Sequence, residues 1–302
     1  MPIFQVIVLA IVQGLAELLP VSSSAHVVVA EKLMGLDPSS PQMTLLLVML
    51  HTGTMFAVIA YFWKQWKRTY FASSDAFKRF AIRVIWATLL TIAIGYPLIK
   101  IIEKTAFKGA AKSEIEQLFN HLELIAPALL AAGILILIAG LMEKRISAAA
   151  QKFFGESVTM RQAGWMGIVQ ALCLPFRGFS RSGTTISTGI LTSATKERAE
   201  RFSFAMAVVI TPLAIGREAL RLVKAAHETV STANFTLNRA ETSIDLHGSI
   251  LTSLLGMAFA FLAGLLALRW LSAWLEEGRW YWFGIYCVIA SGVVFYLHHL
   301  GY

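Results

Sequence analysis

Six stretches of the chain are apolar over about 20 residues each, the length that an α-helix needs to cross a lipid bilayer. Charged residues make up 15% of the chain, against roughly 25% in a soluble domain. Because backbone N–H and C=O groups find no water in hydrocarbon, only helices and closed barrels satisfy them there. We therefore predict an all-α polytopic membrane protein, with spanning helices at residues 43–63, 81–102, 122–142, 202–222, 249–271 and 282–300.

Two further apolar regions, residues 3–36 and 163–196, are interrupted in the middle. Pro20 breaks the first region, and Pro175 and Gly178 break the second. Each apolar arm is shorter than a full span, and irregular backbone is tolerated at membrane depth where it lines a protein cavity. We therefore expect two re-entrant helical hairpins.

The two broken regions resemble each other. Residues 11–16 (IVQGLA) align with residues 168–173 (IVQALC), and in this alignment Ser23 and Ser180 both follow the shared glutamine by ten residues. Three predicted spans follow each hairpin, so the second copy must be inverted in the membrane. The sequence thus predicts one integral membrane domain built as an inverted-topology repeat, with halves 1–150 and 157–302.

Loop charges set the orientation. Loop 64–83 carries six Lys or Arg residues against one Asp, which places it in the cytoplasm. Alternation of the spans then puts loops 143–162 and 269–279 on the same side, and loops 103–121 and 223–248 outside. The net charge of +8 fits basic loops at an anionic membrane surface, and no nucleic-acid-binding signature accompanies it.

A polar island at residues 13–26 places Glu17, Ser23 and His26 at membrane depth, where unpaired polar groups are costly. A hydroxyl, an imidazole and a carboxylate are the parts of an activated nucleophile. We interpret Ser23 as the nucleophile, with His26 as general base on the same helical face and Glu17 orienting it or holding a metal. Attack by His26 itself is the alternative. Ser22, four residues before His26, competes with Ser23 by spacing, and the ten-residue offset that Ser23 shares with Ser180 favours Ser23.

A second polar island surrounds Arg181, which Ser180 and Ser182 flank. A guanidinium offers a fork of donors that suits phosphate oxygens. Residues 184–187 are expected to start the next helical arm, whose N-terminus attracts anions. Each residue alone is typical of a helix cap or a snorkelling side chain. Together, a cationic clamp opposite a hydroxyl nucleophile indicates phosphoryl transfer or phosphate-ester hydrolysis.

Both islands resemble motifs of the undecaprenyl-diphosphate phosphatase (bacitracin-resistance) family. Gln13 and Glu17 match its (Glu/Gln)-x-x-x-Glu motif, and residues 19–26 match Leu-Pro-Val-Ser-Ser-(Thr/Ser)-x-His. Residues 177–185 match Pro-Gly-x-Ser-Arg-Ser-Gly-x-Thr, except that Arg177 stands where the family usually has proline. Two more segments are similar to the family, residues 51–54 (HTGT) and 202–204 (FSF).

The resemblance implies hydrolysis of a C55 polyprenyl diphosphate to the monophosphate and inorganic phosphate, which recycles the lipid carrier for cell-wall synthesis. It implies a divalent cation, Mg²⁺ or Ca²⁺, held by Gln13 and Glu17, and a bacterial plasma (inner) membrane location with the site toward the outer face. The expected catalytic residues are Glu17, Ser23, His26 and Arg181, and the expected substrate-binding residues are Ser22, Ser24, Ser180, Ser182 and Thr185. The expected partners are the polyprenyl lipid and the membrane, and a homodimer is kept as one possible assembly.

A lipid-phosphate transporter or flippase is the alternative function, since inverted repeats with broken helices are typical of transporters. A carrier needs the Arg181 clamp but has no use for a nucleophile, so phosphate release separates the two.

Overall fold

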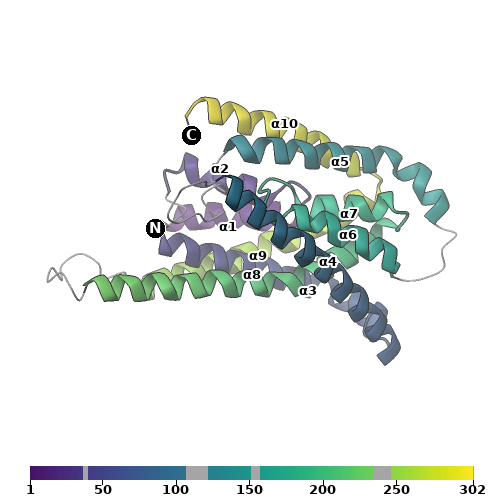
Figure 1. Cartoon of the computed structure of the whole chain (residues 1–302), viewed down its shortest axis with the longest axis horizontal. Coiled ribbons are helices and arrows are strands. Elements are labelled where there is room, and N and C mark those ends of the chain that lie inside the picture. The colour runs from purple at the N-terminus through teal and green to yellow at the C-terminus, as the bar shows by residue number, and fades with distance from the viewer. Residues whose placement is uncertain (37–39, 107–121, 151–156, 234–245, 302) are drawn as a thin grey trace.

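The computed structural model describes residues 1–36, 40–106, 122–150, 157–233 and 246–301, and these ranges contain ten α-helices and no strand (Figure 1). The first half contributes α1 (Ile3–Leu18), α2 (Ser23–Leu33), α3 (Pro41–Thr69), α4 (Ser74–Ala106) and α5 (Leu122–Ala150). The second half contributes α6 (Met160–Leu172), α7 (Arg181–Leu191), α8 (Lys196–Ala233), α9 (Leu246–Glu276) and α10 (Trp280–His299). The predicted all-α class is confirmed.

Five of these helices are long and apolar enough to cross a membrane, and each contains or overlaps one predicted span. They are Gln42–Thr69, Ser74–Thr105, Leu122–Glu143, Ile250–Glu276 and Trp280–His299. The chain is therefore a multi-pass membrane protein. The sixth predicted span, 202–222, lies within helix α8, which is not among the five. Parts of the predicted loops 103–121, 143–162 and 223–248 lie outside the described residues.

The first break, residues 19–22, separates α1 from α2. Leu19 is extended, at φ −74° and ψ 151°, as is usual for a residue before proline, and Pro20 has no N–H with which to continue the helix. Helix α2 then begins at Ser23, capped by Ser22, whose Oγ accepts a hydrogen bond from the backbone N–H of Ala25. Ser22 has a positive φ of 70°, which is unusual for a residue with a side chain.

The second break, residues 173–180, separates α6 from α7. Gly178 lies in the middle of it at φ 101°, and a Cβ there would approach the carbonyl oxygen of Ile125 to 2.5 Å, so glycine is required. Ser180 caps α7 by accepting from the N–H of Gly183. The helix therefore begins at Arg181, and the prediction that residues 184–187 start it was wrong.

The two caps also correct the predicted match between the repeats. Ser22 and Ser180 each accept a hydrogen bond from the N–H three residues later. The structural counterpart of Ser180 is therefore Ser22, and not Ser23 as the ten-residue offset suggested. Ser23 instead corresponds to Arg181, the first residue of the other helix.

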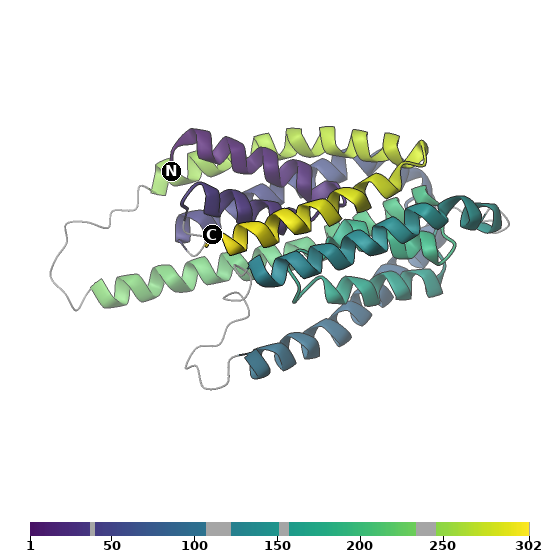
Figure 2. The same cartoon turned by 90° about the horizontal axis from the view of Figure 1, so that it is seen from above.

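Helices of the two halves pack against each other in a reciprocal way. Helix α1 packs on α9, and α6 packs on α4, while α5 and α10 run side by side in both views (Figures 1 and 2). The two breaks meet inside this bundle. The Ser182 hydroxyl donates to the Leu19 carbonyl at 3.2 Å, and the Gly178 N–H donates to Ser24 Oγ at 3.3 Å.

Candidate active site

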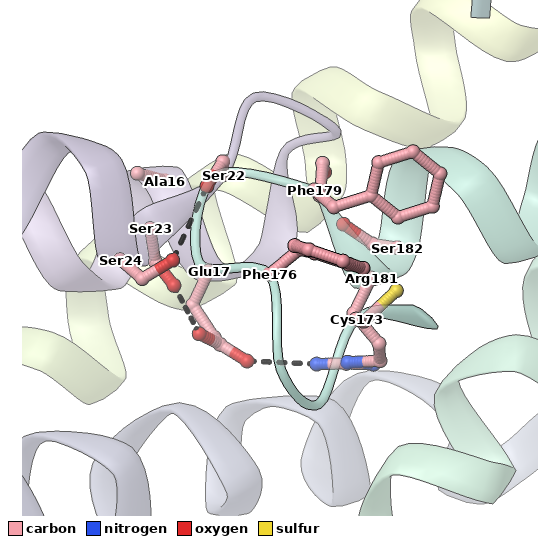
Figure 3. Close-up of a pocket in the computed structure, with 11 residues that line it drawn as sticks. Ala16, Glu17, Ser22, Ser23, Ser24, Cys173, Phe176, Phe179, Arg181 and Ser182 are labelled. Carbon is pink, nitrogen blue, oxygen red and sulfur yellow. Dashed lines mark hydrogen bonds and ion pairs between the residues drawn. The ribbon is translucent and has the colours of Figure 1, made fainter. Parts of the chain in front are cut away.

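A pocket of about 350 Å³, a volume that includes space open to solvent, lies where the two breaks meet (Figure 3). Its walls come from both halves of the chain, with Ala16, Glu17, Ser22, Ser23 and Ser24 on one side and Cys173, Phe176, Phe179, Ser180, Arg181 and Ser182 on the other. Segments about 150 residues apart in the sequence therefore build one site.

The Glu17 carboxylate joins the two sides of this pocket. Its Oε2 accepts a hydrogen bond from Ser23 Oγ at 2.5 Å and one from the Gln13 amide at 3.2 Å. Its Oε1 accepts a hydrogen bond from Arg181 Nη2 at 2.7 Å, and both side chains of this ion pair are less than 20% exposed. A hydroxyl, a carboxylate and a guanidinium are thus linked in one row, as Figure 3 shows.

One guanidinium nitrogen of Arg181 takes no part in its ion pair with Glu17. Its Nη1 is buried and has no hydrogen-bond partner among the described residues. A buried donor without a partner is costly, so this group favours a bound acceptor. Phosphate oxygens match the planar, forked geometry of a guanidinium. The free Nη1 therefore marks the pocket as an anion site.

Two helix N-termini reinforce the positive potential of the pocket. Helix α2 begins at Ser23 and α7 begins at Arg181, and both residues line the pocket. The first N–H groups of a helix lack partners within the helix and carry a partial positive charge, which favours anions. The pocket thus combines a base, a hydroxyl and an electropositive surface.

Four of the five predicted substrate-binding residues line the pocket, namely Ser22, Ser24, Ser180 and Ser182. The fifth, Thr185, does not. Its hydroxyl is fully buried and bonds to the Arg181 carbonyl at 2.7 Å and to Ser203 Oγ at 2.6 Å. Thr185 therefore ties α7 to α8 beneath the pocket instead of facing a ligand.

The structure does not bring His26 to Ser23. His26 Nδ1 lies 2.7 Å from the Ser22 carbonyl oxygen, and Nε2 lies 2.6 Å from the Tyr286 hydroxyl. Both ring nitrogens of His26 are therefore already hydrogen-bonded. The Ser23 hydroxyl donates to the nearby Glu17 carboxylate instead of to His26. The expected hydrogen bond between Ser23 and His26 is absent for this reason.

Two residues near the site were not among the predicted site residues, although one of them, His51, lies in the family-like segment 51–54. His51 Nε2, on α3, lies 3.9 Å from Glu17 Oε2. Its position as a polar residue inside the predicted span 43–63 was a usable signal. Tyr286, which contacts His26, offered no such signal because it is one aromatic residue among several in α10.

A metal site built from protein groups alone is not evident. The described part of the chain has no cluster of three or more His, Cys, Asp or Glu side chains. Mg²⁺, however, is commonly held by one or two carboxylates together with substrate phosphates. Glu17, with the Ser23 hydroxyl and the Gln13 amide bonded to it, fits a cation that is bound jointly with a diphosphate.

Comparison with known proteins agrees with this chemistry. The sequence model of the family described as bacitracin resistance protein BacA matches residues 6–294. Undecaprenyl-diphosphatase 2 of Acinetobacter baylyi is 52% identical over 294 residues, covering 97% of both chains. Undecaprenyl-diphosphatase 2 of Burkholderia thailandensis is 32% identical over 298 residues, covering 96% of this chain and 95% of the relative. The similarity thus extends over nearly the whole length.

Proposed function

The chain belongs to the bacitracin resistance protein BacA family, and we propose that it hydrolyses undecaprenyl diphosphate to the monophosphate and inorganic phosphate in the pocket between the two breaks. The observation that carries this proposal is the row formed by Ser23, Glu17 and Arg181. A nucleophile, a base bonded to it and a cation with a free donor are the parts that phosphoryl transfer requires.

The first half of the reaction follows from these contacts. Ser23 Oγ attacks the terminal phosphorus while Glu17 Oε2, already 2.5 Å away, takes its proton. The bond from that phosphorus to the bridging oxygen breaks, and the polyprenyl monophosphate leaves with the proton that Glu17 passes to its departing oxygen, so that Glu17 is a carboxylate again. Arg181 and the N-termini of α2 and α7 stabilise the charge that develops on the phosphoryl oxygens.

Water completes the reaction. A water molecule attacks the phosphoserine with Glu17 acting as base, which releases inorganic phosphate and restores the Ser23 hydroxyl. Glu17 and Gln13 would hold a divalent cation, which neutralises phosphate charge when it is bound. In this scheme Glu17 replaces His26 as the base, because the His26 ring nitrogens bond elsewhere.

The proposed membrane arrangement places this site within the bilayer. We propose that α1–α2 and α6–α7 are re-entrant hairpins of an inverted repeat, that α8 supplies a sixth span, and that the site faces the outer side of the bacterial inner membrane. The reciprocal packing of α1 on α9 and of α6 on α4 supports the repeat. The basic loop 64–83 supports a cytoplasmic position for the opposite end.

Phosphate release from purified protein tests the proposal. The protein in detergent is incubated with C55 and C15 polyprenyl diphosphates, with and without a chelator, and inorganic phosphate is measured. We expect release from the C55 substrate, its loss in Ser23→Ala, and a strong reduction by chelator that added Mg²⁺ or Ca²⁺ reverses. Binding of the lipid without phosphate release would instead favour a carrier.

A further inference from the structure

Ser22 is held in a conformation that a serine rarely adopts. Its backbone lies at φ 70° and ψ 94°, and the residue is 5% exposed. Such a non-glycine residue carries strain and persists only where its surroundings fix it. Ser22 directly precedes Ser23, so the conformation of Ser22 sets where the Ser23 hydroxyl points.

His26 bonds to the strained residue. The Ser22 carbonyl oxygen can only accept, so His26 Nδ1 must carry the hydrogen that it shares with this oxygen at 2.7 Å. In a neutral imidazole the other nitrogen, Nε2, is then an acceptor. This hydrogen bond joins His26, the fourth residue of α2, to Ser22, the residue that caps the helix. It therefore helps to hold Ser22 in its conformation.

Tyr286 completes the arrangement from the far end of the chain. Its hydroxyl donates to His26 Nε2 at 2.6 Å, and the two rings stack with a 13° interplanar angle. Donation to Nε2 keeps the hydrogen on Nδ1, where the Ser22 carbonyl needs it. A side chain of helix α10 thereby helps to hold the first break, which lies in the other half of the chain.

We infer that His26 and Tyr286 are positioning residues that act through the Ser22 carbonyl to aim the Ser23 hydroxyl at Glu17. This inference rests on the proposed function, since it gives these residues a role in the same reaction. His26 transfers no proton to or from the substrate, and Tyr286 selects the His26 tautomer.

Replacing His26 by the two amide residues separates positioning from proton transfer. The amide nitrogen of Asn reaches the position of Nδ1, whereas that of Gln reaches toward Nε2. We expect His26→Asn to keep kcat within about tenfold of the original. We expect His26→Gln to lose roughly 10²-fold, because a small misplacement of a nucleophile costs about that much. Equal activity of the two variants, high or low, would overturn the inference.

The pH dependence of kcat gives a second readout. The titratable and charged groups around Ser23 are Glu17 on α1, His51 on α3 and Arg181 on α7, and none of them changes in His26→Asn. The acid limb of the profile should therefore persist in His26→Asn. Its disappearance, or an acid-labile phosphohistidine at His26, would show that His26 takes part in the chemistry.

Tyrosine variants of α10 test the outer part of the arrangement. Tyr286→Phe keeps the ring and removes the hydroxyl, and we expect a severalfold lower kcat with an unchanged KM, since one hydrogen bond is lost. Tyr296→Phe removes a hydroxyl from the same helix at a residue that is 62% exposed, and should change neither. Equal effects of the two substitutions would contradict the role of Tyr286.

A spectrum distinguishes failure of this inference from failure of the proposed function. In ¹⁵N-histidine-labelled protein, the signals lost in His26→Asn should belong to an Nδ1-protonated ring, and Tyr286→Phe should shift its Nε2 signal. This result does not require the protein to release phosphate. An Nε2-protonated ring would overturn the inference even in an active phosphatase.

Discussion

The two breaks share one local design but differ in the residue that follows the cap. Each ends at a serine that caps a following helix, Ser22 for α2 and Ser180 for α7. The first residue of the helix that follows is Ser23, which carries a hydroxyl, after the first break and Arg181, which carries a guanidinium, after the second. The shared design aims two helix N-termini at one pocket, and the divergent residues supply complementary chemistry.

The difference extends to the helix that precedes each break. Gln13 bonds to Glu17 four residues later, whereas the matching Gln170 bonds to Thr91, and the position four residues after it is Leu174. A single carboxylate therefore serves both halves. The pocket takes residues from both halves of the chain, so neither half forms it alone.

The largest effect should follow loss of the hydroxyl from the first break. Ser23→Ala removes the proposed nucleophile, and we expect phosphate release to fall by about 10⁴-fold or more. Ser22→Ala and Ser24→Ala should retain measurable turnover, because neither hydroxyl bonds to Glu17. Acid-stable phosphoserine at Ser23 would support this ranking, and an active Ser23→Ala would reverse it.

Loss of the single carboxylate should come next. Glu17→Gln keeps the shape of the side chain but removes the base and the partner of Arg181, so we expect a fall of roughly 10³-fold in kcat. Leu174→Ala, four residues after Gln170 as Glu17 is after Gln13, should remain close to the original enzyme. Phosphate release measures both, and comparable losses would mean that the two breaks do not differ as described.

The second break should be more tolerant of a change that keeps its charge. Arg181→Lys replaces a forked donor with a point charge, and we expect a loss of about 10²-fold in kcat/KM. Arg177→Lys, in the same break but outside the pocket wall, should retain most activity. Turnover near the original in Arg181→Lys would remove the bidentate contact from the mechanism.

The smallest effect concerns backbone conformation and stability. Gly178→Ala places a Cβ 2.5 Å from the Ile125 carbonyl oxygen at a positive φ, and we expect a destabilisation of about 1–3 kcal/mol. Ser22→Gly relieves a positive φ and loses a cap worth only a few tenths of a kcal/mol relative to glycine, so its stability should change little. Thermal unfolding in detergent compares them, and a higher midpoint for Gly178→Ala would contradict the steric argument.

Much of the fold and part of the site could be predicted because their causes are local. A run of about 20 apolar residues specifies a membrane helix by its own composition. A proline biases the residue before it toward an extended conformation, so Pro20 ends the first helix at Leu19 and sets the position of the first break. The polar residues Glu17, Ser23 and Arg181 in apolar surroundings likewise indicated a site, since isolated polar groups are costly there.

The packing of the helices determines which of these groups bond to each other. Spacing along α2 favoured Ser23 with His26, but the Arg181–Glu17 ion pair spans 164 positions and brings its carboxylate beside Ser23. His26 instead meets Tyr286, 260 positions away. Helix periodicity fixes the direction of a side chain relative to its own helix alone. The partner that it meets depends on the packing of helices from the opposite half of the chain.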